Sequence, residues 1–245
     1  MKADARKWQV TDLHTGAAQS RRLCSKVTED VLQAAMSFYG AHIFPRLMDW
    51  VMSGSEFGRL RADLLREVQG EVLEIGFGTG LNLVHYPPGL LHLSAVDPAP
   101  ALRHRVAARI AAAPFPVEQY QEPAERLPFT DGRFDWVVTT WTLCSVADPV
   151  RALAEAGRVL KPGGRLRFLE HGRSADPRTA AWQNRLNPIQ NVIGCGCHLN
   201  RPIDELIGRS GFRFMSLERF QMDHVPRVAG EMYRGTAEVV SPDKT

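Results

Sequence analysis

The fold is decided by residues 72–82, which read V-L-E-I-G-F-G-T-G-L-N. The apolar run around Glu74 is typical of a buried strand, and Gly76, Gly78 and Gly80 mark a turn before a helix. In doubly wound sheets such a turn lies at the carboxyl edge of the strands, where ligands bind. Glycines let the backbone approach a ligand closely, and the helix N-terminus offers free N–H groups to an anion. The stretch therefore predicts a ligand site at this edge of a parallel sheet.

Two features separate this loop from a dinucleotide site. Its glycines follow the spacing G-x-G-x-G instead of G-x-G-x-x-G, and Glu74 places a carboxylate before the turn, where it would repel a pyrophosphate. S-adenosylmethionine instead carries an ammonium group and a sulfonium. Glu74 can attract its amino-acid end, while helix N–H groups and Asn82 receive its carboxylate. The charges therefore favour S-adenosylmethionine as the cofactor.

Further candidate ligands for this cofactor follow the next strands. Asp97 comes about 20 positions after Gly76, where an acid can accept hydrogen bonds from both ribose hydroxyls, and Pro98 ends the strand. Ala124 and Glu125 lie in a loop that can reach the adenine, although Glu125 could equally be a solvated loop residue.

The exit of the fourth strand supplies two more candidates, Thr140 and Trp141. The face of Trp141 can pack on the adenine or line the acceptor cavity, and simple core packing is the alternative. Both residues are therefore included among the expected cofactor ligands.

Short β-rich runs alternate with helical segments beyond residue 70, the pattern of parallel strands with right-handed crossovers. The expected strands span residues 71–75, 92–96, 116–120, 134–139 and 165–170. The expected crossover helices span residues 81–86, 99–112 and 149–160, and the run K-P-G-G at 161–164 ends the last one. Helices near 178–192 and 202–210 precede β-like runs at 212–220 and 231–240. The prediction is an α/β, Rossmann-like, doubly wound and mostly parallel seven-stranded sheet with an antiparallel edge hairpin.

The residues before the sheet form two parts. Residues 1–27 have few large apolar side chains and are expected to be a flexible extension. Residues 28–67 show helical spacing, interrupted at Pro45 and at Ser53-Gly54, which predicts two or three N-terminal helices. These helices either cover the donor site and form an apolar acceptor wall or make an ordinary amphipathic layer. We expect one α/β domain over residues 28–245 that includes this helical cap.

The charge and the apolar content of the sequence limit which partners and which location are expected. The formal net charge is only +3, and no long basic run occurs, so no nucleic-acid partner is expected. No uncharged apolar stretch approaches the roughly 18 residues that span a bilayer, and the start lacks a signal peptide's apolar core, which predicts a cytoplasmic protein. The four scattered cysteines are expected to be reduced thiols. Peripheral membrane contact and oligomeric state stay open.

From about residue 70 to 170 the chain resembles the class I S-adenosylmethionine-dependent methyltransferases. The motifs that carry the resemblance are Glu74 to Gly80, Leu127-Pro128-Phe129, Phe134-Asp135 and Leu160-Lys161-Pro162-Gly163-Gly164. The resemblance implies an enzyme that transfers a methyl group from S-adenosylmethionine.

A narrower similarity, to the methyltransferase-like thiol S-methyltransferases and their bacterial relatives, extends to about residue 240. It rests on Tyr86-Pro87-Pro88-Gly89, Thr142-Leu143-Cys144-Ser145-Val146, Phe168-Leu169-Glu170-His171, Trp182-Gln183 and Gly196-Cys197-His198-Leu199-Asn200-Arg201. It implies a small, apolar nucleophile such as a thiol as the acceptor. Methylation of carbon, oxygen or nitrogen in a quinone precursor, lipid head group or secondary metabolite stays open, as does cofactor binding without catalysis.

Two histidines are the expected catalytic residues. His171 should lie at the carboxyl end of the fifth strand, beside the donor methyl, and imidazole titrates near neutral pH. His198 lies in a loop expected to cover the same edge, and for both residues a structural role is the alternative. No metal site is expected from Cys195, Cys197 and His198, because C-x-C-H supplies at most three clustered donors and no second cysteine pair completes a zinc site.

Overall fold

The computed structural model describes residues 37–99 and 102–240. The chain divides into two units, Met1–Ile43 and Phe44–Thr245. Within the first unit, the described part contains a short π-helix, η1 (Tyr39–Ile43). The extension predicted for residues 1–27 lies outside the described residues. Every candidate site residue belongs to the second unit.

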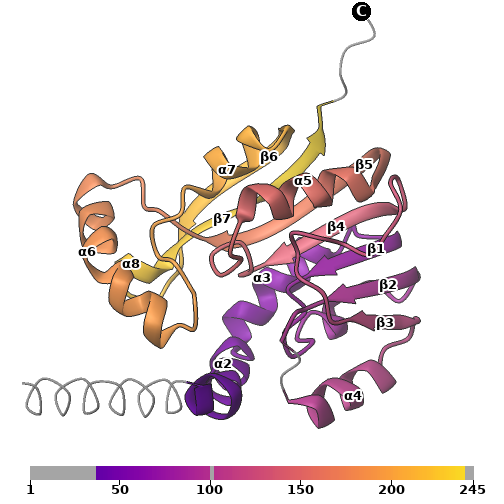
Figure 1. Cartoon of the computed structure of the whole chain (residues 1–245), viewed down its shortest axis with the longest axis horizontal. Helices are drawn as coiled ribbons and strands as arrows, with labels where there is room; N and C mark the ends of the chain where they lie inside the picture. Colours follow the sequence, from indigo (N-terminus) through magenta and orange to yellow (C-terminus); the bar gives the residue numbers. More distant parts are fainter. Residues whose placement is uncertain (1–36, 100–101, 241–245) are drawn as a thin grey trace, which may run out of the picture. The chain divides into compact units, whose positions relative to one another are not determined.

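One seven-stranded sheet forms the centre of the second unit (Figure 1). Its strands are β1 (Gly70–Ile75), β2 (Leu90–Val96), β3 (Val117–Tyr120), β4 (Phe134–Thr140), β5 (Leu160–His171), β6 (Phe212–Gln221) and β7 (Glu231–Val239). They lie in the order β3-β2-β1-β4-β5-β7-β6. The first five pair in parallel, whereas β7 is antiparallel to both β5 and β6. The predicted Rossmann-like sheet with its antiparallel edge hairpin is confirmed, and the strand order reverses between β1 and β4.

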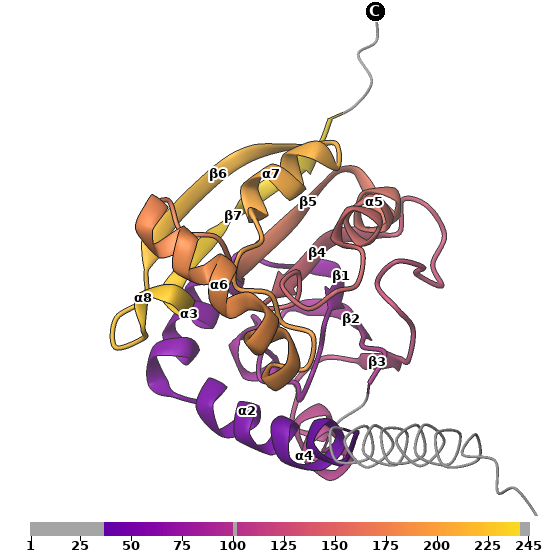
Figure 2. The same cartoon turned by 60° about the vertical axis from the view of Figure 1, so that its left-hand side comes forward.

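Helices cover both faces of this sheet (Figure 2). Because neighbouring strand residues point to opposite faces, Val72 and Leu73 enter two different hydrophobic clusters. The cluster with Val72 includes residues of α3 (Ser55–Leu65), the 3₁₀-helix η2 (Leu83–His85) and α4 (Arg103–Ala111). The cluster with Leu73 includes residues of α5 (Pro149–Val159) and α7 (Ile203–Arg209).

The remaining helices are α2 (Phe44–Met52), α6 (Pro177–Ile193) and α8 (Arg227–Gly230). The expected interruption at Pro45 is not a break in the helix, because Pro45 is the second residue of α2. Among the described residues, no helix combines the length and the apolar character that crossing a bilayer requires.

One predicted crossover helix is wrong. Instead of a helix over residues 81–86, the chain makes a single 3₁₀ turn, η2. Tyr86 ends it in an extended conformation, as expected for a residue that precedes proline. The side chains of Asn82 and Tyr86 both turn to Glu74, so tertiary hydrogen bonds replace a regular helix here.

Other predicted boundaries shift by a few residues. The helix expected over 99–112 is shorter, because Leu102 adopts a left-handed conformation with φ of 48° just before α4 begins at Arg103. α5 ends at Val159, as the run at 161–164 predicts, but β5 begins directly at Leu160 and pairs there with Phe134.

Candidate active site

A buried carboxyl group stands at the carboxyl end of β1. Glu74 is 1% exposed. Its Oε1 accepts a hydrogen bond from the Asn82 amide at 3.0 Å, and its Oε2 accepts one from the Tyr86 hydroxyl at 2.8 Å. The same amide nitrogen donates to the Thr140 hydroxyl at 3.0 Å, which links β1, η2 and β4. The acid is thus fixed in place beside the glycine loop.

Burial changes the charge of this acid. It raises the pKa of Glu74 to about 7, although Tyr86, Asn82 and the cation Arg61 act in the opposite direction. Arg61 comes from α3, donates to the Met52 carbonyl at 2.7 Å and lies 4.8 Å from the centre of the Trp141 ring. A cation that hydrogen-bonds to Glu74 would stabilise its ionised form and offset the burial.

The glycine loop is shaped by a close approach to the exit of β4. Gly76 has φ of +79°, and a Cβ atom there would lie 2.0 Å from the Thr142 hydroxyl oxygen. That hydroxyl donates to the Ile75 carbonyl or the Thr140 carbonyl, both at 3.1 Å. Only glycine therefore lets the loop after β1 and the loop after β4 come together.

Gly76→Ala is expected to destabilise the protein through this contact. Gly132→Ala is the matched control, because Gly132 has φ of +65° but nothing within 4 Å of a built Cβ. The control should lower the free energy of unfolding by about 1 kcal/mol from backbone strain. Gly76→Ala should lower it by about 2 kcal/mol more, because overpacking adds to the strain. Urea unfolding measures both, and equal losses would contradict the close approach.

Asp97 follows β2 directly and closes the other side of the loop. Its Oδ2 accepts from the backbone N–H of Gly78 at 2.7 Å, and its Oδ1 accepts from that of Ala99 at 2.9 Å. Burial raises the pKa of Asp97 above its usual value, against these two hydrogen bonds. Each carboxylate oxygen has a second lone pair, so both can still accept a hydroxyl hydrogen.

These residues fit S-adenosylmethionine. Asn82 is 2% exposed, and within the described part of the chain its Oδ1 has no hydrogen-bond partner. The Asn82 side chain also contacts Glu74, so one ammonium group could donate hydrogen bonds both to the Asn82 Oδ1 and to the Glu74 carboxylate. Asp97 offers acceptors for hydroxyls on the far side of the loop. The donor set therefore matches the ammonium and ribose ends of the cofactor.

Three other predicted cofactor residues, Ala124, Glu125 and Pro98, differ in their burial and in their contacts. Ala124 is buried in the core cluster of Leu73. Glu125 is half-buried and accepts from the backbone N–H of Asp148 at 2.9 Å, so it contacts the start of α5 instead of standing free in a solvated loop. Pro98 is exposed, and its carbonyl accepts from the Gln121 amide.

Trp141 lies between the donor loop and the N-terminal helices. It has φ of +50°, and its ring packs edge-on against Phe57 of α3 with ring centres 5.4 Å apart. Together with the Arg61 contact, this shows that α3 covers the exit of β4. Of the residues predicted to form a cap, Phe57 and Arg61 of α3 thus contact Trp141.

A second buried acid holds the loop after β4. Glu170, near the end of β5, is fully buried, and its Oε2 accepts from the backbone N–H groups of Thr142 at 2.8 Å and Leu143 at 3.1 Å. Burial raises the pKa of Glu170 to about 8. The acid therefore ties the ends of β4 and β5 together at the edge where the cofactor residues lie.

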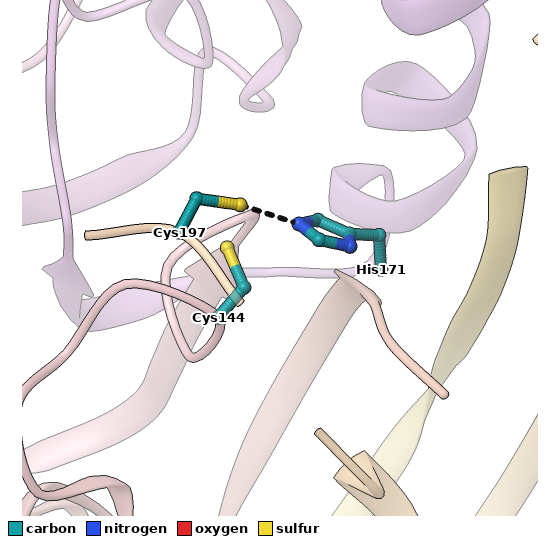
Figure 3. A group of neighbouring side chains, drawn as sticks. All are labelled: Cys144, His171 and Cys197. Atoms are coloured by element: carbon teal, nitrogen blue, oxygen red, sulfur yellow. Dashed lines mark hydrogen bonds between the residues drawn. The ribbon is translucent and has the colours of Figure 1, made fainter. Parts of the chain in front are cut away.

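His171 meets two cysteines at this edge (Figure 3). Its Nε2 is 3.1 Å from the Sγ of Cys197, and Cys144 completes the group, with all three ligand atoms within 4.8 Å of one another. Cys144 is buried, and Cys197 is half-buried. The contact with Cys144 and burial raise the pKa of the Cys197 thiol well above its usual range, while His171 opposes the shift.

His198 does not join this group. Asn187 and Asn191 of α6 hydrogen-bond to its Nδ1 and Nε2 at 3.1 and 3.0 Å. Its backbone N–H donates to the Cys144 carbonyl at 2.9 Å. The ring therefore anchors the loop of Cys197 to α6, which matches the structural alternative for this histidine.

Sequence reasoning missed three contributors to the site. Tyr86 was seen only as part of a motif, although a tyrosine just before Pro87 could have signalled the end of a turn. Glu170 was visible only as the residue before His171. Arg61 carried no signal, because an arginine in an amphipathic helix is ordinarily exposed.

Comparisons with known proteins agree with this geometry. Residues 73–168 match the family model described as a methyltransferase domain. Thiol S-methyltransferase TMT1B of Rattus norvegicus is 38% identical over 159 residues, which cover 60% of this chain and 62% of the rat protein. Thiol S-methyltransferase TMT1A of Homo sapiens is 34% identical over 160 residues, which cover 61% of this chain and 63% of the human protein. The matched region spans less than two thirds of these relatives.

A solved structure shows the same fold. A S-adenosylmethionine-dependent methyltransferase from Methanosarcina mazei superposes with a TM-score of 0.54, covering 74% of this chain and 98% of its own, at 21% identity. The cofactor predicted from the charges of the loop is the one this fold class uses. Residues 73–168 therefore match a methyltransferase domain, and they lie in a sheet with the fold of this S-adenosylmethionine-dependent methyltransferase.

Proposed function

We propose that the protein methylates a small, apolar thiol. The observation that carries the proposal is the placement of His171 at the end of β5, next to the β4 exit that contacts the donor loop. The similarity to thiol S-methyltransferases supports the choice of sulfur as the attacking atom.

The reaction asks little of the protein beyond alignment. S-adenosylmethionine supplies an electrophilic methyl group on a sulfonium. Glu74, Asn82 and Asp97 fix the two ends of the donor, so its methyl group takes one orientation. Trp141 and Phe57 contribute aromatic surface that excludes water and favours an apolar acceptor. A thiol with a pKa near 8.5 is already a few per cent thiolate at neutral pH, so modest stabilisation of its anion suffices.

A product assay tests the acceptor. The full chain is incubated with S-adenosylmethionine and either thiophenol or phenol, two acceptors that differ in the attacking atom, and the methylated products are measured by mass spectrometry. We expect methyl phenyl sulfide from thiophenol and little anisole from phenol. Methylation of phenol or a quinone precursor without methylation of any thiol would reject the proposal.

His171→Gln tests whether His171 stabilises the acceptor thiolate. It should lower kcat for thiophenol by about tenfold or more, because the imidazole no longer assists the thiolate. His104→Gln is the matched control, because His104 is exposed on α4. Binding of S-adenosylhomocysteine should be unchanged in both variants, which shows that the donor site is intact. Equal kcat values in wild type and His171→Gln would contradict a role for His171.

A further inference from the structure

The group of Cys144, His171 and Cys197 has the composition of a metal site. The three side chains come from the loop after β4, the end of β5 and the loop after α6, and they point toward one another (Figure 3). Their ligand atoms lie within 4.8 Å of one another. Two thiolates and an imidazole are ligands that Zn²⁺ prefers, whereas Mg²⁺ and Ca²⁺ prefer oxygen.

We propose that Cys144, His171 and Cys197 bind one Zn²⁺ ion and leave its fourth position open to the acceptor thiol. Three protein ligands with one open position are typical of catalytic zinc sites, whereas structural sites are closed by a fourth protein ligand. The binding of the ion stands on the geometry alone, and the binding of the acceptor to it rests on the proposed function. From the sequence, no metal site is expected at Cys195, Cys197 and His198, and of these three only Cys197 belongs to the proposed site.

The backbone around the ligands is already held in place. The His198 N–H donates to the Cys144 carbonyl at 2.9 Å, which joins the two cysteine loops directly. Arg201 donates through Nη1 to the carbonyls of Leu143 and Val146, on either side of Cys144. An ion would replace the hydrogen bonds that the ligand atoms make now, between His171 Nε2 and Cys197 Sγ and from Cys144 Sγ to the Trp141 carbonyl or the Ser145 hydroxyl.

The distances require only small adjustments, in which His171 Nε2 and Cys197 Sγ move slightly apart and wider separations shorten. Zinc bonds of about 2.3 Å to sulfur and about 2.0 Å to nitrogen place tetrahedral ligand atoms roughly 3.5 to 4 Å apart. The His171 Nε2 and Cys197 Sγ atoms are at 3.1 Å, and the widest separation in the group is no more than 4.8 Å. Rotation of the side chains about χ1 can supply this change without moving the backbone.

The position of these three side chains beside the donor loop indicates what a bound ion would do. Thr142, two residues before Cys144, contacts the end of β1, so the group lies at the same sheet edge as the donor loop. On binding the ion, the two cysteine thiols release their protons to solvent. An acceptor thiol then binds at the open position as a thiolate and releases its proton too. The thiolate sulfur bonds to the methyl carbon, the carbon–sulfonium bond breaks, and its electron pair leaves with S-adenosylhomocysteine. The neutral methyl thioether then leaves the ion, which reopens the fourth position.

Cobalt binding tests the site directly. The full chain, kept reduced with a phosphine and stripped of metal by a chelator, is titrated with Co²⁺ and followed by absorbance. We expect one ion per chain with a thiolate-to-cobalt charge-transfer band, displaced by one equivalent of Zn²⁺. Cys197→Ser and Cys144→Ser should each weaken binding at least about tenfold and reduce that band. Cys195→Ser is the matched control, because Cys195 is exposed and outside the group, and it should behave as wild type.

Each outcome decides one part of the inference. Folding of the variants is checked by S-adenosylhomocysteine binding, and His171→Gln provides a third ligand variant with both cysteines intact. No charge-transfer band in wild type, or the same band in Cys197→Ser, would overturn the site. If thiophenol shifts the cobalt spectrum, the open position binds thiols. Metal binding without methylation of any thiol would reject the proposed acceptor and leave the site, whereas unchanged kcat/KM in metal-free protein would reject the metal's role and leave the acceptor.

Discussion

Asp97→Ala is expected to weaken S-adenosylhomocysteine binding at least about 100-fold. A carboxylate that accepts from two ribose hydroxyls makes hydrogen bonds worth about 1.5 to 3 kcal/mol each, and 1.4 kcal/mol corresponds to a tenfold change in Kd. Asp97 also holds the glycine loop through the Gly78 N–H at 2.7 Å, so its loss loosens the backbone that faces the ligand. Isothermal titration of the full chain measures the change.

Asp135→Ala is the matched control for this variant. Asp135 also accepts from a backbone N–H, that of Glu71 at 2.9 Å, but it lies at the start of β4, on the opposite edge of the sheet. Its substitution should cost some stability and leave the Kd unchanged. If Asp97→Ala binds S-adenosylhomocysteine within about threefold of wild type, the ribose is bound elsewhere.

Glu74 is expected to make cofactor binding depend on pH. Because burial raises its pKa to about 7, the acid is largely protonated below neutral pH and cannot attract the ammonium group of the ligand. The affinity for S-adenosylhomocysteine should therefore rise by up to about tenfold for each pH unit toward 7 and level off above it. Glu74→Gln should bind more weakly at pH 8 and lose this dependence. An unchanged pH profile in the variant would show that Glu74 does not contact the ligand.

The same shift predicts a pH dependence of stability without ligand. The folded-state pKa of Glu74 lies above its usual value of 4.5, so the folded protein retains a proton that the unfolded chain has lost. The free energy of unfolding should therefore fall as pH rises from about 4.5 to about 7, by up to about 3 kcal/mol from this group. Urea unfolding should show a smaller slope in Glu74→Gln. Burial raises the pKa of Glu170 to about 8, so Glu170→Gln should remove a separate part of this pH dependence of unfolding, one that extends to about pH 8.

Local sequence was sufficient where structure depends on neighbours along the chain. The strand, glycine turn and carboxylate of residues 72–82 form one continuous motif, and Asp97 follows the next strand at the spacing that a single crossover requires. The antiparallel hairpin of β6 and β7 was also predictable, because two β-rich runs follow α7, with only the short α8 between them. In each case the residues that matter are separated by two elements or fewer.

Prediction failed where a side chain found a distant partner. The segment 81–86 has helical spacing, but Asn82 and Tyr86 bond to Glu74, and only a 3₁₀ turn remains. The solvated alternative for Glu125 is likewise wrong, because Glu125 accepts from the N–H of Asp148, while its contact with adenine stays a prediction. The spacing of apolar residues does not predict these hydrogen bonds. The partner of a buried polar group depends on which other polar groups are buried beside it.

The candidate cofactor residues were therefore predictable from the sequence, because residues 72–82 and Asp97 supply both the charges and the glycines. The group of Cys144, His171 and Cys197, where we propose that the acceptor binds, depends on tertiary structure. Cys197 and His171 are 26 residues apart, and Cys144 belongs to a third segment. They meet because β4 and β5 are neighbours in the sheet and the loop after α6 is hydrogen-bonded over their ends. Strand order and loop packing, not sequence spacing, set the distances between these three side chains.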